Sequence, residues 1–201
     1  MNKSLTFKQY RMIDLTVLAV ILALTETLIC RATNAWFPDQ PYTVSVVTAV
    51  IAISMMRWSG WSAVHAVLGG VVYALASGGS AEQTVIYAVG NLAVLSVLLL
   101  HKWIGKEKIR DNPAITAVYA AAVHTAASLG RFAVSLAFGG KLTAVTAFLA
   151  SDALSGVFAI VVVLIARKLD GIFEDQKHYL IREEKKREDA RPRKTETSYN
   201  Y

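Results

Sequence analysis

Four ionisable side chains interrupt the apolar stretches of this sequence, and they are Glu26, Arg31, Arg131 and Asp152. A charge inside a membrane-spanning helix costs at least about 2.5 to 3.5 kcal/mol, so such side chains usually have a function or a partner. The planar guanidinium of arginine suits an acidic or carbonyl group, to which it donates charge-assisted hydrogen bonds. A carboxylate accepts hydrogen bonds from the donors of a ligand. These residue types therefore predict a site for a small polar molecule.

Further polar side chains recur at intervals of three or four residues, which places them on one side of each predicted helix. This set comprises Tyr87 and Asn91, then His124, Ser128 and Arg131, then Asp152 and Ser155. A helix rises about 1.5 Å per residue, and on that rise the four ionisable side chains Glu26, Arg31, Arg131 and Asp152 lie in the outer half of the membrane or at its rim. We therefore expect a polar cavity that opens to the outside of the cell.

The segment after the first apolar run carries Asn34, Trp36 and Tyr42, and we expect it to be a loop. Aromatic side chains in this loop could stack on a ring of the ligand and cover the cavity. The chemistry suits a small molecule that carries both charge signs or an acid, together with a ring.

Other readings of the same residues stay open. Arg131 and Asp152 could form an internal ion pair, because intramembrane charges usually find partners. His124 could be a hydrogen-bonded packing residue. His124, Arg131 and Asp152 could also serve an intramembrane enzyme such as a lipid-modifying hydrolase, although Ser128, the nearest nucleophile, has no evident base. The four histidines are too scattered to share one ion, so we expect no metal. We also expect no cofactor and no catalytic residue.

Composition limits the class of protein. The chain has 201 residues, of which 54% are hydrophobic and 18% charged, whereas a soluble domain carries about 25% charged residues. The stretch from Pro113 to Ala166 contains only three charged side chains. A soluble enzyme, a disordered chain and a disulfide-stapled domain are therefore excluded. The net charge of +6 lies in basic residues that flank apolar runs, which indicates membrane topology and not a nucleic-acid-binding face.

Apolar runs predict an all-α membrane protein with six transmembrane helices, since a bilayer core needs about 20 apolar residues per helix. The predicted spans are Leu15–Cys30, Tyr42–Met56, Trp61–Ala76, Gln83–Leu100, Ala114–Phe138 and Leu142–Ala166. The short sequence from Arg57 to Gly60 predicts a tight turn between the second and third. With both termini in the cytoplasm, every Lys and Arg except Arg31, Arg131 and Lys141 faces inward, as the positive-inside rule requires.

The chain divides into a transmembrane substrate-binding domain, residues 1–169, and a charged cytoplasmic tail, residues 170–201. Opposite charges four residues apart, as in Glu183 and Arg187, favour a helix in the first half of the tail. We expect this helix to continue the sixth span, and we expect disorder after Arg191.

Small residues mark a second surface. Ala19 and Ala23 are four residues apart on the first span, and such a face lets another helix approach closely. Packing inside the bundle and docking of a second subunit are equally good readings of this motif.

With these features the sequence resembles the S components of energy-coupling factor (ECF) transporters. The shared features are six helices in about 200 residues, the Ala-x-x-x-Ala motif, the lid-like first outer loop and the polar outer cavity on helices four to six. The segment from Phe148 to Leu154 is similar to the start of helix six in several S components, where an acidic residue often occurs. The charged tail is longer than is typical, and no signature for thiamine, riboflavin or biotin is present.

The resemblance implies a function. An S component lies in the bacterial cytoplasmic membrane, captures a vitamin or similar micronutrient at the outer face, and docks on a transmembrane coupling subunit (the T component). Two cytoplasmic ATPases then drive uptake. By this resemblance Ala19 and Ala23 match the docking motif, and Trp36 and Tyr42 lie in the lid. A membrane assembly or structural subunit without a ligand is the alternative, but it would leave the intramembrane charges unexplained.

Overall fold

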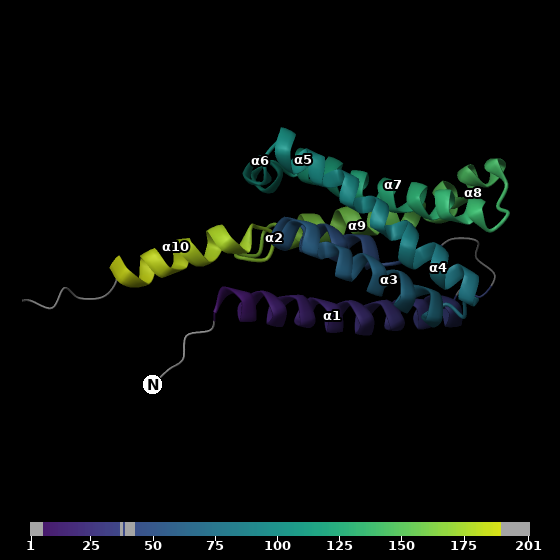
Figure 1. Ribbon diagram of the computed structural model, residues 1–201, viewed down its shortest axis with the longest axis horizontal. Helices are drawn as coiled ribbons and strands as arrows, with labels where there is room; N and C mark the ends of the chain where they lie inside the picture. The colour runs from purple at the N-terminus through teal and green to yellow at the C-terminus, as the bar shows by residue number, and fades with distance from the viewer. Residues whose placement is uncertain (1–5, 37, 39–42, 190–201) are drawn as a thin grey trace, which may run out of the picture.

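The computed structural model describes residues 6–36, 38 and 43–189, and every regular element in those residues is a helix. The helices run roughly along one long axis and form an elongated bundle (Figure 1). α1 begins at the end of the bundle from which α10 extends. The all-helical fold predicted from the sequence is therefore confirmed.

α1 (Phe7–Trp36) is longer than the predicted span of Leu15–Cys30. Its 30 residues would extend about 45 Å at 1.5 Å per residue. Neither proline nor glycine occurs between its ends, so nothing in the sequence stops the helix early. Asn34 and Trp36 therefore belong to the last turns of a helix, and the prediction that they lie in a loop is wrong.

α2 (Val47–Trp58) and α3 (Ala63–Ala76) form a hairpin. Ser59 reverses the chain with a φ of 52°, in the left-handed region. As a result Ser54 Oγ lies 2.9 Å from His65 Nδ1, although eleven residues would span about 16 Å along a straight helix. The tight turn predicted between the second and third apolar runs is thus present.

α4 (Ala81–Gly90) continues through a 3-10 segment, η2 (Asn91–Val97), into α5 (Leu98–Trp103), close to the predicted span of Gln83–Leu100. A capping box starts α4, because the side chain and backbone of Ser80 exchange hydrogen bonds with those of Gln83. The change to 3-10 geometry begins at Asn91, one of the candidate site residues.

α6 (Lys106–Asp111) leads into α7 (Pro113–Ala137), which matches the predicted fifth span. Asn112 Oδ1 accepts two N–H groups of the first turn of α7, and Pro113 occupies a position where a missing donor does no harm. The start of α7 is therefore fixed by local sequence.

The sixth predicted span, Leu142–Ala166, is interrupted. It contains α8 (Val145–Ser151) and α9 (Ala153–Ala166), which meet at Asp152. Aspartate forms helices poorly because its short side chain bonds to other groups instead, and at this position it bonds to other parts of the chain. The break places the carboxylate at the junction of the two helices.

α10 (Gln176–Asp189) does not continue α9, so that prediction is wrong. Residues 167–175 form turns in which Gly171 has a φ of 71°. Arg57, at the end of α2, donates hydrogen bonds of 2.5 and 3.1 Å to the carbonyl oxygens of Gly171 and Ile172. These bonds attach the turn to the bundle, and α10 then extends beyond it (Figure 1). Residues 190–201, for which we expected disorder, lie outside the described residues.

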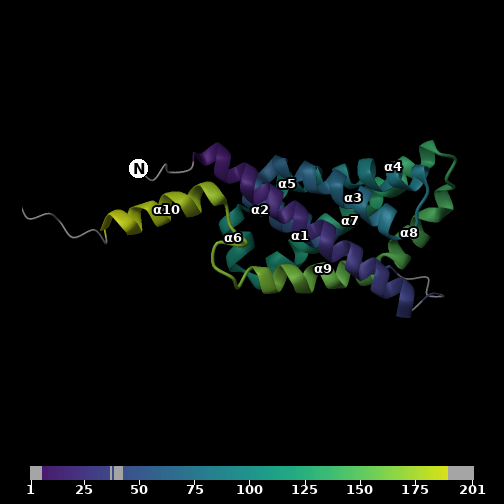
Figure 2. The same ribbon diagram turned by 90° about the horizontal axis from the view of Figure 1, so that it is seen from below.

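α2 lies at the centre of the bundle. All twelve of its residues are buried, and α1, α3, α7 and α9 all contact it. Figure 2 shows α1 crossing this group of helices from one end of the bundle to the other. Because α2 is buried on every side, it requires small and branched side chains that fit closely between the neighbouring helices.

Three helical segments of the described chain are long and apolar enough to cross a membrane: Phe7–Trp36, Val47–Ala76 and Ala81–Trp103. The second of these is the α2–α3 hairpin, so it folds back on itself. A shorter apolar helix is α9. The structure is thus compatible with a membrane location, while the six spans and the inward-facing termini remain predictions.

Candidate functional site

The site begins with a close approach of α4 and α7. A Cβ atom on Gly130 would lie 2.1 Å from the carbonyl oxygen of Gly90, and one on Gly90 would lie 2.5 Å from Arg131 Cα. Only glycine allows two backbones to come this close. The contact places Asn91, the residue after Gly90, beside Arg131.

Arg131 is the centre of a buried polar network. Its Nη1 donates a hydrogen bond of 2.5 Å to Asp152 Oδ2, and its Nε donates one of 2.8 Å to Asn91 Oδ1. The guanidinium also lies 4.9 Å from the ring centre of Tyr87, a cation–π contact. Arg131 is 4% and Asp152 7% exposed, so both charges are shielded from solvent.

Asp152 accepts hydrogen bonds from two more side chains. Ser128 Oγ donates to its Oδ2 over 3.1 Å, and Thr43 Oγ1 donates to its Oδ1 over 2.9 Å. Ser155 Oγ donates to the carbonyl oxygen of Thr43 over 3.0 Å, and Thr43 N–H donates to the carbonyl of Ser151. Asp152 and the start of α9 therefore hold the chain that leads from α1 to α2.

A second buried carboxylate, Glu26, lies on α1. It is fully buried and accepts the N–H of Val46 over 2.8 Å, just before α2 begins. Cys30 Sγ lies 3.6 Å from its other oxygen. A carboxylate at a helix N-terminus is favoured by the helix dipole, so Glu26 fixes the start of α2 next to the network of Arg131.

The polar network encloses little free space. Seven residues line a cavity beside Arg131, namely Ser45, Val47, Tyr73, Tyr87, Asn91, Arg131 and Asp152. Its empty volume is about 180 Å³, and no water-sized sphere fits in it. Among the described residues the network therefore surrounds no water-sized space, and a cavity open to the outside of the cell stays a prediction.

His124 lies at the edge of the network. Its Nδ1 is 3.3 Å from Thr48 Oγ1 and its Nε2 is 3.9 Å from Asp152 Oδ2. A Cβ on Gly156 would lie 2.8 Å from the imidazole ring, so the glycine makes room for it. Ser128 and His124 both face Asp152 and, within the described residues, do not bond to each other; a serine nucleophile activated by histidine would need such a bond.

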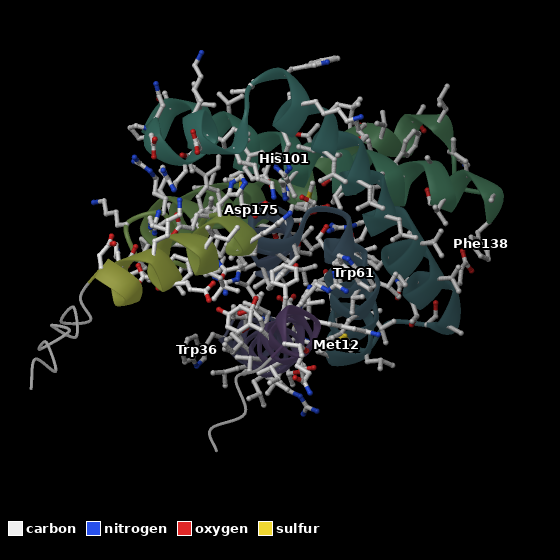
Figure 3. All side chains as sticks on the ribbon, turned by 60° about the vertical axis from the view of Figure 1, so that its left-hand side comes forward. Met12, Trp36, Trp61, His101, Phe138 and Asp175 are labelled. Atoms are coloured by element: carbon white, nitrogen blue, oxygen red, sulfur yellow. The ribbon has the colours of Figure 1, made fainter. Side chains whose placement is uncertain are left out.

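The structure brings together most of the residues that the sequence predicted for the site, and these are Glu26, Tyr87, Asn91, His124, Ser128, Arg131, Asp152 and Ser155. It does not bring Arg31, Asn34 or Trp36 to them, because all three are exposed on the last turns of α1. Trp36 is 76% exposed and points away from the bundle (Figure 3). Tyr42 lies outside the described residues.

Several residues of the site were missed at the sequence level. Thr43, Ser45 and Thr48 carry short hydroxyl side chains that alone give no signal in an apolar run. Gly90 and Gly130 gave a weak signal in the sequence, since a glycine within a helical pattern marks a close approach of backbones. Groups of three or more His, Cys, Asp or Glu side chains that could hold a metal do not occur in the described part of the chain.

Ala19 and Ala23 line a different feature, an apolar groove between α1 and α3 of about 370 Å³. Both alanines are partly buried. Trp61 and Met12, both labelled in Figure 3, line the same groove. The small side chains on α1 thus leave a depression on the surface and do not pack fully against α3.

Comparison with known proteins adds no relative: no protein-family model, no curated protein and no solved structure matches this chain. The likeness to ECF S components therefore rests on the sequence features alone. The functional assignment depends on the geometry of the chain's own residues.

Proposed function

We propose that the chain is a membrane-embedded substrate-binding subunit of the S-component type, which binds its ligand at the network of Arg131 and Asp152. The observation that supports this most is a buried group of three ionisable side chains, Arg131, Asp152 and Glu26, contributed by α7, the junction of α8 and α9, and α1. Buried charges are unfavourable for folding unless they are paired, and in membrane helices they mark functional sites. A ligand that carries both charge signs would use all three.

In this proposal the ligand exchanges bonds with the network. A carboxylate or carbonyl of the ligand replaces Asp152 on the guanidinium of Arg131, and the ligand's donors bind Asp152 and Glu26. Because no water-sized sphere fits in the closed network, the ligand enters only after local opening. Four hydrogen bonds hold Thr43 to Ser151, Asp152 and Ser155, and in this proposal they break when the network opens.

Uptake against a gradient requires an energy source from outside this chain, because the sequence contains no phosphate-binding loop for ATP. The apolar groove at Ala19 and Ala23 suits a helix of a transmembrane coupling subunit, because small side chains allow close approach. Through that subunit, two cytoplasmic ATPases would supply the energy. The location that fits is the bacterial cytoplasmic membrane, with a vitamin or related micronutrient as the substrate.

One observation favours a second candidate, a structural or assembly subunit without a ligand. The charges of Arg131 and Asp152 already satisfy each other at 2.5 Å, and the network has no room for a ligand as it stands. An ion pair of this kind would connect α7 to the junction of α8 and α9 and do nothing else.

Mass spectrometry of small molecules released from the purified, folded protein by denaturation tests the proposal. A stoichiometric micronutrient is expected. If none is released, the folded protein is next titrated with a panel of vitamins that includes thiamine, riboflavin and biotin. Absence of binding across this panel would favour the structural subunit.

Substitution then separates ligand contact from internal pairing. Arg131→Met should weaken ligand binding by about ten- to a hundredfold, since a hydrogen bond to a charged group contributes about 1.5 to 3 kcal/mol. If Arg131 and Asp152 both contact the ligand, Arg131→Met with Asp152→Asn binds worse than either single variant. Recovery of affinity in the double variant would show that the two residues form only a structural pair.

The docking surface has its own test. Ala19→Trp with Ala23→Trp fills the groove, so uptake should be lost in cells that supply the coupling subunit and ATPases, while ligand binding to the isolated chain is retained. Val17→Trp with Leu24→Trp is a matched control, because both side chains are exposed on another side of α1. If Ala19→Trp with Ala23→Trp showed normal uptake, the docking surface would lie elsewhere.

A further inference from the structure

A basic pocket lies at the end of the bundle opposite the polar network. It has a volume of about 390 Å³ and is formed by α6, the turn after α9, and α10. Five basic side chains line it, and they are Arg110, Arg167, Lys168, Arg182 and Lys186. Only two acidic side chains, Asp170 and Glu174, line it as well. The lining charges therefore sum to +3.

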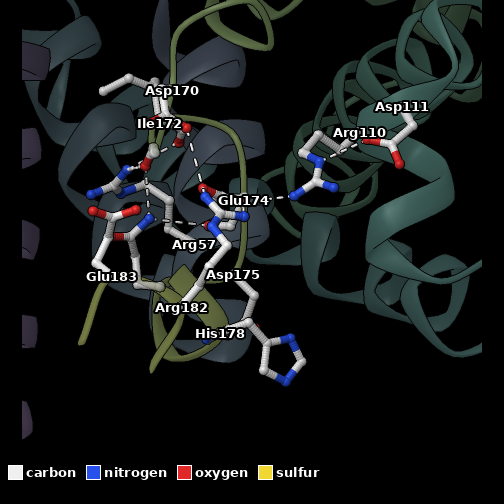
Figure 4. Close-up of polar contacts among 12 residues, drawn as sticks. Arg57, Arg110, Asp111, Asp170, Ile172, Glu174, Asp175, His178, Arg182 and Glu183 are labelled. Atoms are coloured by element: carbon white, nitrogen blue, oxygen red, sulfur yellow. Dashed lines mark hydrogen bonds and ion pairs between the residues drawn. The ribbon is translucent and has the colours of Figure 1, made fainter. Parts of the chain in front are cut away.

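Glu174 holds two of the arginines in place. Arg110 donates to it over 2.6 Å, and Arg182 donates over 2.7 and 3.0 Å. Figure 4 shows Arg110 and Arg182 converging on this carboxylate from different elements. Arg110 also bonds to Asp111 at 2.8 Å, and Asp170 is 3.6 Å from Arg182. The guanidinium groups are thus fixed, but their charge is largely balanced.

Two other cations of the pocket have no carboxylate partner within the described residues. Arg167 donates to the carbonyl oxygens of Arg110 and Asp111, each over 2.9 Å, and the carboxylate of Asp111 acts on its charge only at longer range. Lys168 is exposed, and its ammonium group makes no hydrogen bond or ion pair in that part of the chain. Lys186 bonds to Glu183 at 2.7 Å but remains 61% exposed. The pocket can therefore accept an anion beside Arg167 and Lys168.

An apolar strip leads to this pocket along α9. Four exposed side chains of the strip lie on α9 and recur every three or four residues, which places them on one side of the helix, and a fifth follows in the turn after α9. They are Leu154, Val157, Val161, Ile165 and Leu169, each 47 to 61% exposed. Arg167 and Lys168 stand at its end, next to Leu169, which itself lines the pocket. An amphiphile with an anionic head and an apolar chain matches this arrangement.

We propose that the pocket binds the phosphate group of an anionic phospholipid, whose acyl chain lies along the strip on α9. Basic pockets at the ends of membrane helices bind such headgroups, and each lysine or arginine near the surface contributes to the attraction. Free phosphate shares the charge of the headgroup, but it would leave the apolar strip unused. The inference rests on the membrane location proposed above and is independent of the ligand at Arg131 and of docking at Ala19.

Native mass spectrometry of the full-length chain in a nonionic detergent tests this. Titration with phosphatidylglycerol should give a saturable one-to-one adduct, while phosphatidylcholine should bind more weakly. Lys168→Gln with Lys186→Gln should weaken the phosphatidylglycerol adduct about 25-fold, at roughly fivefold per lysine. Both side chains are exposed, so the variant should fold as the parent does.

Lys108→Gln with Lys177→Gln is the matched control, because it removes the same charge from exposed positions nearby that do not line the pocket. It should bind phosphatidylglycerol as the parent does. Equal weakening in both double variants would show only diffuse attraction to surface charge and overturn the proposal. Unchanged binding in the pocket variant would overturn it too. Displacement of the lipid by inorganic phosphate at an equal concentration would identify a soluble-anion site and refute the lipid assignment.

Discussion

Removal of the Arg131 side chain tests the energetics of the buried network directly. Arg131→Met keeps an apolar stem of similar length but leaves Asp152, which is 7% exposed, without a counter-charge. Removal of one partner of a buried ion pair costs about 3 to 5 kcal/mol. Asp152 still accepts hydrogen bonds from Ser128 and Thr43, so we expect a loss near the lower end, about 3 kcal/mol.

The double variant Arg131→Met with Asp152→Asn supplies the decisive comparison. It removes both charges, and an asparagine at position 152 can still accept the hydrogen bond from Thr43. Neutral replacement of a buried pair is often harmless, so the double variant should be more stable than Arg131→Met alone. The remaining loss, about 1 kcal/mol, comes from Asn91 Oδ1, which loses its donor while Asn91 Nδ2 keeps its bond to Ala66.

The free energy of unfolding in mixed micelles, measured by helical circular dichroism during titration with a denaturing detergent, gives these values. Arg31→Met is the control, since Arg31 is exposed and a surface substitution should change stability by less than about 0.5 kcal/mol. If Arg131→Met resembled this control, the pair would contribute nothing to stability. If the effects of the two single variants simply added in the double variant, Arg131 and Asp152 would not be coupled.

Three further outcomes follow from the geometry. Gly130→Ala should destabilise the protein by about 1 to 3 kcal/mol in the same unfolding titration, because the new Cβ would meet the carbonyl of Gly90 at 2.1 Å; retained stability would mean that α4 and α7 can separate easily. Asn112→Ala should cost about 1 kcal/mol through loss of the N-cap of α7, with Asn112→Ser as the nearly neutral control. Burial raises the pKa of Asp175, but the hydrogen bond and charge of Lys106, together with the backbone N–H groups of Lys177 and His178, lower it below the usual 3.8. The stabilisation by Asp175 is therefore present above pH 3.8 and is lost as the pH falls through the lower folded pKa. In Asp175→Asn this loss of stability at acidic pH should disappear. An unchanged dependence of stability on pH in the variant would contradict the role of Asp175.

The sequence alone determined that the protein is all-helical and where its main helices lie along the chain. Long apolar runs without charge can be stable only as buried or membrane-embedded helices, whatever the packing. The turn after Arg57 and the start of α7 were also readable, because turns and caps depend on neighbouring residues. The set of polar residues on α4, α7 and α9 was predictable for a similar reason, since side chains three or four apart share a side of any helix.

The tertiary structure alone decided how those polar residues pair. That Arg131 meets both Asp152 and Asn91 depends on the contact of Gly90 with Gly130, which joins segments forty residues apart. The break of the sixth span at Asp152 and the separate direction of α10 depend likewise on partners distant in sequence. The apolar run across Asp152 and the charge pattern after it predicted continuous helices, and such patterns carry no information on long-range hydrogen bonds. The sequence thus specified which side chains could do chemistry, and packing decided that they form a closed network.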